Sequence, residues 1–268
     1  MPLFPDFVAR YGPWAVVAGA SEGIGQSYAH LLAERGLNLI TLARRTEPLE
    51  ADAALIRRRH RVEVRPLSLD LAASDLSERF TEIISGLDVG LLVYNACYSH
   101  ISPFIDSSLQ QHQLTLDVNC RGPLTLSHAL APRLIERGRG GIILMPSMSG
   151  FQGTAMVANY AATKAYNINL AQGLWSELGP RGVDVLACVA GATSTPGFES
   201  NTPEERRAKA FPMRAEAVAR EGLKALGKRP VQVVGRINRS VDFVTGLMSR
   251  KARTRFFSKA TQDIYGKI

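Results

Sequence analysis

The chain has 268 residues, 46% of them hydrophobic, which is enough to bury a full core as a single domain. Its apolar runs fall short of the roughly 20 residues of a membrane span, and its N-terminus lacks the pattern of a secretory leader. Because Cys97, Cys120 and Cys188 are too few and too scattered for a disulfide framework or a zinc site, we expect a cytoplasmic protein without a metal site or a membrane span.

From residue 14 onward, short apolar runs alternate with amphipathic stretches. Strands are predicted at 14–19, 38–43, 62–67, 89–95, 141–147, 183–190 and 231–235. Helices are predicted at 25–36, 47–60, 74–86, 106–137, 157–182 and 215–226. Alternation of this kind predicts one α/β domain of the Rossmann type, with a doubly wound, mostly parallel, seven-stranded sheet and helices on both faces. Such a sheet binds ligands at the carboxyl ends of its strands.

The first predicted strand ends in "AGASEGIG", which places Gly19, Gly23 and Gly25 at the junction with a helix. Small residues there let the backbone approach a diphosphate, and the helix N-terminus supplies free N–H groups. The same spacing also occurs in a plain strand-to-helix connection. Its place after the first strand favours a nucleotide site.

The second predicted strand ends in "LITLARRT", where an NAD enzyme is expected to present an acid to the ribose hydroxyls. Arg44 and Arg45 stand there instead, and a guanidinium is suited to a 2′-phosphate. We therefore predict NADP as the cofactor, with Arg44 as its ligand. The alternative is that both arginines are only the exposed start of a loop.

In "NYAATKA", Tyr160 and Lys164 are four positions apart on a predicted helix, so both lie on one face. A cation beside a phenol favours phenolate and lowers its pKa, which makes tyrosine a usable proton donor near neutrality. For so short a pattern, a chance pair on a solvated helix face is the competing explanation.

The segment 194–215 is predicted to cover the open end of the site. Pro196, Gly197 and Pro203 interrupt regular structure, a short polar helix follows, and Phe211 and Met213 then offer apolar side chains for a lid. A lid of this kind favours bulky apolar substrates. The alternative is an ordinary surface loop whose Phe211 packs on the core.

The C-terminal quarter is strongly basic. Residues 201–268 hold 16 Lys/Arg and 6 Asp/Glu, a net +10, whereas the first 200 residues hold 16 and 18, a net −2. The basic segment, about 236–268, is suited to phosphates of a nucleotide or CoA thioester, an anionic membrane surface, or nucleic acid; it is equally explained as solvated helix surface. No usual nucleic-acid motif is present, so we expect no nucleic-acid partner.

Together these features make the sequence similar to the short-chain dehydrogenase/reductase family over roughly residues 12–240. The family's Tyr-x-x-x-Lys matches Tyr160 and Lys164, its serine matches Ser147, and its helix asparagine matches Asn119. The resemblance implies that Ser147 binds the substrate oxygen, Tyr160 donates the proton, Lys164 assists the phenol and holds the ribose, and Asn119 supports a relay water. Alternatively, Ser147 merely caps a turn and Asn119 merely satisfies buried backbone groups.

The resemblance also implies a set of cofactor-binding residues. Asp70 in "LSLDL" matches the acid that meets the adenine amino group, and Asn95 in "YNAC" matches a structural asparagine. The chain departs from the family at "YNAC", at Ala18-Gly19 and at Ala190-Gly191, which leaves the roles of Thr193 and Thr195 open. The full set is Gly19, Ser21, Gly23, Ile24, Gly25, Arg44, Asp70, Leu71, Asn95, Tyr160, Lys164, Gly191, Thr193 and Thr195.

The expected activity is NADP(H)-dependent hydride transfer between a ketone or aldehyde and an alcohol. "RYGPWAVVAGASEGIG" is most similar to the branch of 3-oxoacyl-CoA reductases and hydroxysteroid dehydrogenases, which implies a bulky steroid, aryl, alicyclic or 3-oxoacyl substrate. The family also implies a homodimer or homotetramer paired through the helices that hold Asn119 and Tyr160. The alternatives are a non-redox lyase or epimerase and an NADPH-sensing regulatory protein.

Overall fold

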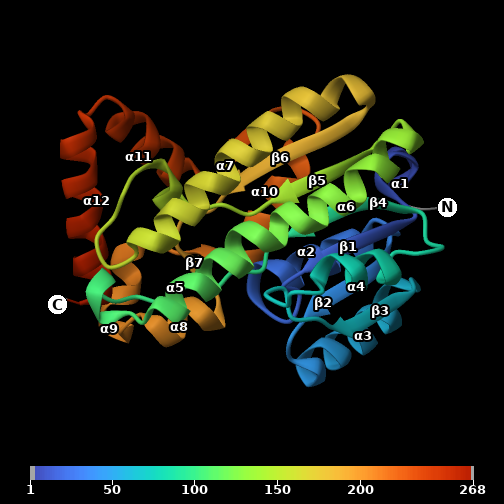
Figure 1. Ribbon diagram of the computed structural model, residues 1–268, viewed down its shortest axis with the longest axis horizontal. Coiled ribbons are helices and arrows are strands. Elements are labelled where there is room, and N and C mark those ends of the chain that lie inside the picture. The colour runs from blue at the N-terminus through green and yellow to red at the C-terminus, as the bar shows by residue number, and fades with distance from the viewer. Residues whose placement is uncertain (1–3, 267–268) are drawn as a thin grey trace.

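The computed structural model describes residues 4–266 and contains a parallel sheet in the order β3-β2-β1-β4-β5-β6-β9 (Figure 1). Every neighbouring pair in this sheet is parallel. The strands are β1 (Trp14–Ala18), β2 (Asn38–Ala43), β3 (Val64–Ser68), β4 (Val89–Tyr94), β5 (Gly140–Leu144), β6 (Val183–Val189) and β9 (Val231–Val233). The predicted seven-stranded, doubly wound fold is therefore confirmed.

Helices cover both faces of the sheet. One face packs against α1 (Pro5–Tyr11), α2 (Gly23–Glu34), α3 (Thr46–His60) and α10 (Ala215–Ala225). The other packs against α4 (Leu76–Ile83), α6 (Gly122–Arg137) and α7 (Ala158–Leu178). Strands β1, β4 and β5 are buried along their whole length, which explains why they are continuously apolar and do not alternate.

The predicted helix over 106–137 is interrupted in the structure. Ser108 and Gln111 form a capping box that starts α5 (Leu109–Leu116) later than predicted. A π-helical turn, η2 (Asp117–Arg121), then joins α5 to α6. The interruption has a local cause, because Pro123 lacks the N–H that would bond the carbonyl of Asn119 in a continuous α-helix.

Two carbonyls released by this turn find side-chain donors. The Tyr94 hydroxyl donates to the Val118 carbonyl at 2.6 Å, and the Asn167 side-chain amide donates to the Asn119 carbonyl at 2.8 Å. A Cβ on Gly122 would lie 2.0 Å from the Tyr94 hydroxyl, so a side chain there would displace Tyr94. Tyr94, one of the departures from the family pattern, thus holds the π-turn against the end of β4.

The remaining elements lie beyond the carboxyl ends of the strands or follow β9. A two-stranded sheet pairs β7 (Thr193–Ser194) with β8 (Met213–Arg214). Between them lie α8 (Pro196–Asn201) and α9 (Glu204–Arg207), and the chain closes with α11 (Arg236–Gly246) and α12 (Arg250–Tyr265). Among residues 4–266, no helix is long and apolar enough to cross a bilayer.

Candidate active site

The glycines that follow β1 stand where a side chain would not fit. Gly19 has a φ of +78°, and a Cβ there would meet the backbone of Ala96 at 2.6 Å. A Cβ on Gly25 would meet the Gly19 carbonyl oxygen at 2.0 Å. The Asn95 amide donates to that same carbonyl at 3.0 Å, which ties the end of β4 to the turn. The structure therefore brings these three predicted residues together.

The N-terminus of α2 is suited to an anion. Glu22 stands at the cap position but makes no side-chain hydrogen bond to the helix. Free N–H groups and the helix dipole favour a phosphate group at such a point. A Cβ on Gly23 would meet the Thr195 side chain at 2.8 Å, so the residue that begins the segment after β7 lies directly against the turn. The glycine turn and the helix end thus fit the diphosphate of a dinucleotide.

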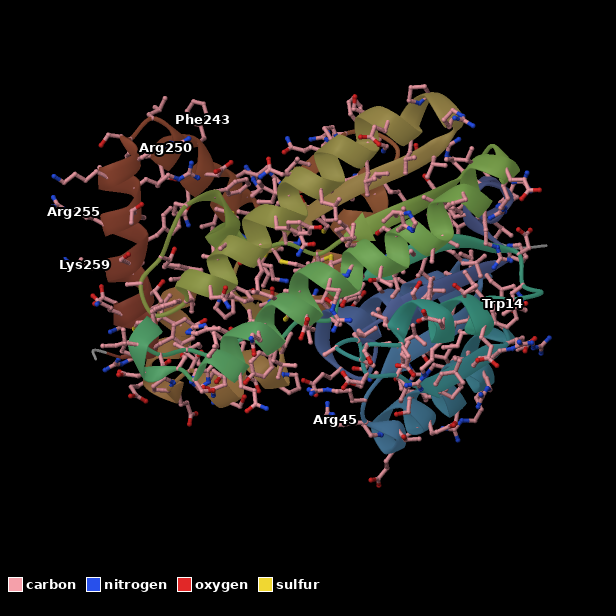
Figure 2. The ribbon with its side chains drawn as sticks, viewed as in Figure 1. Trp14, Arg45, Phe243, Arg250, Arg255 and Lys259 are labelled. Atoms are coloured by element: carbon pink, nitrogen blue, oxygen red, sulfur yellow. The ribbon has the colours of Figure 1, made fainter. Side chains whose placement is uncertain are left out.

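The arginines at the end of β2 take different positions. The Arg45 guanidinium forms an ion pair with Glu22 and lies 3.5 Å from the Ser21 hydroxyl (Figure 2). Arg44 is exposed, and its backbone carbonyl accepts a hydrogen bond from Ser68. Arg45, which was not among the predicted ligands, is therefore the arginine attached to the glycine turn. Only side-chain packing distinguishes these adjacent arginines, so nothing in the sequence indicates which of them contacts the turn.

The other predicted cofactor residues lie around the same edge of the sheet. Asp70 is exposed after β3 and accepts a hydrogen bond from the Ala72 amide at 3.0 Å, while Leu71 is buried in the core. Ile24, in the first turn of α2, packs partly against the core. Beyond β6, Thr193 is buried and donates to the Gly191 carbonyl at 3.1 Å. A Cβ on Gly191 would meet the Asn238 amide of α11 at 2.6 Å.

Tyr160, Lys164 and Ser147 meet at the carboxyl end of β5. Lys164 is buried, donates to the Met145 carbonyl at 2.9 Å, and its Nζ lies 5.4 Å from the centre of the Tyr160 ring. Ser147 follows β5 and forms a bridge to Ala190 at the end of β6. Its hydroxyl accepts from the Ser149 amide at 3.3 Å, so the capping role considered above is present in the structure.

The expected lowering of the Tyr160 pKa is wrong for this structure. Burial of the phenol is the largest effect and raises its pKa, and the nearby Cys97 thiol raises it further. The Ser147 hydroxyl lowers it. Tyr265 of α12 is also close enough to raise it. Burial also lowers the pKa of Lys164, because desolvation disfavours its charged form. The phenol is therefore held in its protonated form.

Asn119 is fully engaged in the fold. Its side-chain oxygen accepts from the Tyr98 amide at 2.8 Å, and its nitrogen donates to the Tyr98 carbonyl at 2.9 Å and to Thr163 at 3.1 Å. The interpretation that Asn119 satisfies buried backbone groups thus describes its contacts. Its part in a proton relay stays a prediction.

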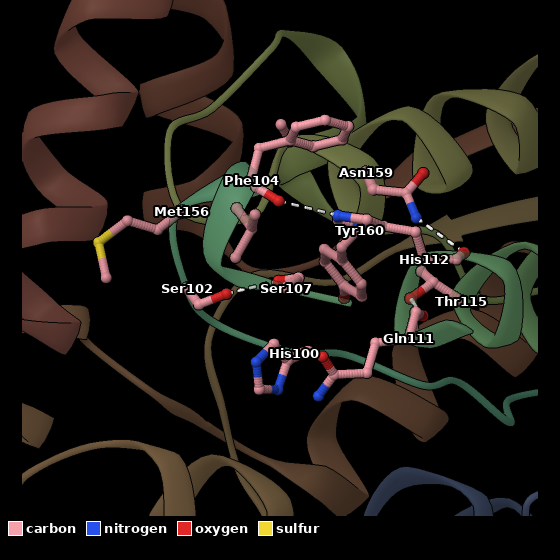
Figure 3. Close-up of a pocket in the computed structure, with 12 residues that line it drawn as sticks. His100, Ser102, Phe104, Ser107, Gln111, His112, Thr115, Met156, Asn159 and Tyr160 are labelled. Atoms are coloured by element: carbon pink, nitrogen blue, oxygen red, sulfur yellow. Dashed lines mark hydrogen bonds between the residues drawn. The ribbon is translucent and has the colours of Figure 1, made fainter. Parts of the chain in front are cut away.

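A pocket opens beside Tyr160 (Figure 3). Its walls come from the loop after β4, from α5 and from the first turn of α7. Three hydrogen bonds brace it: Ser102 with Ser107 at 2.5 Å, His112 with the Phe104 carbonyl at 3.0 Å, and the Asn159 amide to the His112 carbonyl at 3.0 Å. His112 also stacks on the Phe104 ring with centroids 4.4 Å apart.

These walls were missed by sequence reasoning, because apart from Ser147 and Tyr160 it placed the substrate contacts in the segment 194–215. His100 and Gln111 line the pocket on the side of Tyr160 shown in Figure 3, yet they belong to a loop and a helix far from it in sequence. The capping pattern at Ser108 was the available clue, because it ends the loop and fixes where α5 begins. No pattern in the sequence shows which side chains of that loop turn inward.

The segment 194–215 contains the predicted polar helix as α9, but its apolar residues diverge. Phe211 is 68% exposed with a φ of +48°, so the alternative in which it packs on the core is wrong. Met213 lies in β8 and packs partly against the core. Neither lines the pocket beside Tyr160 as the described chain stands. A role for Phe211 in closing the site stays a prediction.

The parallel doubly wound sheet and the glycine turn at the end of β1 define a dinucleotide-binding protein of the Rossmann type. Residues 13–206 match the family model described as short chain dehydrogenase. The chain belongs to the short-chain dehydrogenases, a family of oxidoreductases.

Two curated relatives are similar to the chain. A 7beta-hydroxysteroid dehydrogenase of Clostridium sardiniense is 36% identical over 234 residues, which cover 87% of this chain and 90% of that protein. A very-long-chain 3-oxoacyl-CoA reductase of Podospora anserina is 36% identical over 191 residues, which cover 69% of this chain and only 56% of the fungal protein. Both belong to the branch that the sequence resembles.

Solved structures agree with this assignment. A structure from work on 7beta-hydroxysteroid dehydrogenase stereoselectivity superposes with a TM-score of 0.88 at 26% identity and covers 96% of this chain and 99% of its own. A short-chain dehydrogenase from Sphingobium yanoikuyae in complex with NADPH has a TM-score of 0.75 at 28% identity, with 92% and 96% covered.

Proposed function

We propose that the chain is an NADP(H)-dependent oxidoreductase that interconverts a ketone or aldehyde and an alcohol on a bulky apolar substrate. The observation that carries this proposal is the position of Tyr160, which lies at a pocket wall with Lys164 and Ser147 beside it. A bound nicotinamide cofactor would supply or accept the hydride. The protein's own residues must then position the carbonyl and manage one proton.

In the reductive direction, the protonated phenol of Tyr160 is the proton donor to the substrate oxygen. Burial keeps that phenol protonated at neutral pH, which suits a donor. Ser147 supplies a second hydrogen bond to the same oxygen, and both donors stabilise its developing negative charge. Lys164 holds the nicotinamide ribose, and its positive charge assists the loss of the tyrosine proton.

The diphosphate would lie on the glycine turn at the N-terminus of α2, where a Cβ at Gly25 would be only 2.0 Å from a carbonyl oxygen. For the adenosine end, Arg44 and Arg45 support NADP, because the end of β2 carries guanidinium groups and no carboxylate. Arg45 is already paired with Glu22, so Arg44 is the arginine we assign to the 2′-phosphate.

The assignment of a bulky substrate is supported by the relatives, one of which is a hydroxysteroid dehydrogenase. The exposed Phe211 beyond β7 would add apolar contact if the segment 194–215 closes over the site. Exposed apolar side chains along α5, α6 and α7, namely Leu116, Leu124, Tyr166 and Trp175, support pairing of two copies through these helices. The three free cysteines support a reducing compartment, the cytoplasm.

The decisive experiment measures the steady-state oxidation of NADPH, from the decrease in its absorbance, with a matched series of carbonyl compounds. The series runs from acetone-sized ketones and hydroxyacetone to aryl, decalone-like, steroid and 3-oxoacyl compounds. We expect kcat/KM to rise with apolar bulk. A flat series, or a preference for small polar carbonyls, would rule out the substrate class.

The same assay separates the two other functions. Product formation without consumption of NADPH would identify a lyase or epimerase, whereas tight NADPH binding without turnover of any carbonyl would identify a sensor.

A further inference from the structure

Helices α11 and α12 form one end of the molecule, at the opposite end from α3 (Figure 1). An ion pair between Arg253 and Asp242, with 2.7 Å between nitrogen and oxygen, fixes α12 to α11. The Ala155 amide donates to the Ser258 hydroxyl at 3.0 Å and joins α12 to the loop before α7. The two helices are thus a packed part of the fold and not a loose tail.

This end of the molecule exposes an apolar stripe. Ile237, Val244 and Leu247 follow one another at helical spacing along α11 and the residue after it, and they are 58%, 55% and 78% exposed. Phe243, beside them, is 73% exposed. Large apolar side chains gathered in this way are unfavourable in water and mark an interaction site.

Cations lie on α12, the helix that follows the stripe in the chain. Lys251, Arg255 and Lys259 recur every four residues on α12, so like charges face one another along one side of the helix, which is destabilising without a counter-charge. Figure 2 shows Arg255 and Lys259 projecting outward from α12, with Arg250 and Phe243 at the adjoining corner. Within residues 4–266, none of these four cations forms an ion pair, whereas Arg239 and Arg253 do.

We propose that this surface docks on an anionic lipid membrane. We call it the α11–α12 face and define it by Ile237, Phe243, Val244, Leu247, Arg250, Lys251, Arg255 and Lys259. Apolar side chains rimmed by Lys and Arg are the pattern of helices that lie in the headgroup region, where the apolar groups insert and the cations meet lipid phosphates. The surface charge of such a membrane supplies a counter-charge for these cations, which pair with no carboxylate in the described part of the chain.

The charge of the α11–α12 face argues against other occupants. A second copy docked by a two-fold axis would bring the same unpaired cations against each other. Nucleic acid would satisfy the cations but would leave Phe243 and Leu247 against water or charged backbone. An anionic bilayer satisfies both kinds of side chain.

Vesicle sedimentation tests the proposal without using the proposed activity. The full-length protein is spun with vesicles of phosphatidylcholine alone and with vesicles that also contain phosphatidylglycerol. We expect binding to the anionic vesicles, little binding to the neutral ones, and loss of binding as salt is raised.

Matched variants then locate the binding surface. Arg255→Gln/Lys259→Gln should weaken binding at least about tenfold, because each cation near such a surface contributes roughly a factor of five. Phe243→Ser/Leu247→Ser should weaken it by a similar factor, since it removes the inserting groups. The control is Arg58→Gln/Arg59→Gln, which removes the same charge from exposed positions on α3 and should leave binding unchanged. NADPH binding confirms that each variant is folded.

Several outcomes would overturn the proposal. Absence of sedimentation with anionic vesicles, or an equal loss in the α3 control, would remove the α11–α12 face as a membrane site. A fall in molecular mass for Phe243→Ser/Leu247→Ser in light scattering, with vesicle binding intact, would assign the face to contact between copies. Competition by RNA that Phe243→Ser/Leu247→Ser leaves unchanged would assign it to nucleic acid. Because none of these measurements depends on turnover, failure here is distinct from failure of the proposed reductase.

Discussion

The cofactor end and the substrate end of this site are built differently. At the cofactor end, backbone geometry dominates, because none of the positions Gly19, Gly23 and Gly25 in one short segment has room for a Cβ. At the substrate end, the pocket walls come from segments far apart in sequence and are joined by side-chain hydrogen bonds such as Asn159 to His112. A short motif therefore predicts local backbone geometry, whereas no short motif predicts a pocket wall made of distant segments.

If the two ends of the site are separable, removing the proton donor should greatly lower turnover and leave cofactor binding unchanged. Tyr160→Phe keeps the packing of the ring but removes the hydroxyl, so we expect turnover to fall by at least about 100-fold while NADPH affinity persists. Stopped-flow turnover and fluorescence titration of NADPH measure the two quantities. Turnover within a few-fold of the wild-type value would contradict the assignment of Tyr160.

The pH dependence should differ between the two directions of the reaction. Burial raises the Tyr160 pKa, so the protonated donor needed for reduction is present throughout the neutral range. Alcohol oxidation needs the deprotonated phenol. At pH values below the pKa, the deprotonated fraction increases up to about tenfold for each unit by which the pH rises. Measured with saturating cofactor, oxidation should therefore keep rising between about pH 7 and 10, while reduction stays nearly flat. An oxidation rate that levels off near neutrality would mean that the bound cofactor and Lys164 lower the pKa after all.

At the cofactor end alone, Arg44→Ser should change which nicotinamide is preferred. We expect the wild-type chain to bind NADPH at least about tenfold more tightly than NADH, which corresponds to about 1.4 kcal/mol. The variant should lose most of that preference. Its affinity for NADH and its ranking of carbonyl substrates by kcat/KM should be unchanged. Arg45→Ser is the informative comparison, because Arg45 is engaged by Glu22. A larger loss of NADPH preference in Arg45→Ser than in Arg44→Ser would assign the 2′-phosphate to Arg45.

At the substrate end alone, Phe211→Ala should have the smallest effect. If Phe211 closes over a bulky substrate, its removal should lower kcat/KM for that substrate about fivefold, from lost apolar contact, and leave small ketones and NADPH affinity unchanged. Phe211 is 68% exposed, so the variant should fold normally. An equal effect on every substrate, or no effect on any, would remove Phe211 from the site.

The sequence predicted the order of strands and helices and the glycine turn after β1 well. The cofactor-binding residues assigned from the family resemblance stay predictions. Continuous apolar runs such as Val89–Tyr94 indicate strands covered on both faces, and the structure buries them completely. The glycine spacing was sufficient to locate the turn, because the turn depends only on local backbone geometry. The grouping of Tyr160 with Lys164 followed from helical periodicity alone.

What the sequence did not predict depends on tertiary contacts. The pKa of Tyr160 is governed by burial, which a motif does not contain. His100 and Gln111 line the pocket because the loop after β4 is bonded to α5 through His112, and α5 is bonded to α7 through Asn159. Arg45 and Arg44 are neighbours in the sequence, and only the position of Glu22 distinguishes them.

The π-turn between α5 and α6 also sets the rotational phase of the helix that follows it. One residue in an α-helix corresponds to about 100° of rotation, so the wider turn at Asp117–Arg121 changes the direction in which every later side chain points. With this phase, Leu126, Leu130 and Leu134 face the sheet and are buried. The same residues wound as an uninterrupted α-helix through 117–121 would turn those three leucines away from the core. The π-turn therefore lets the chain hold one residue more than a continuous α-helix would at this place, and α6 still buries the same face.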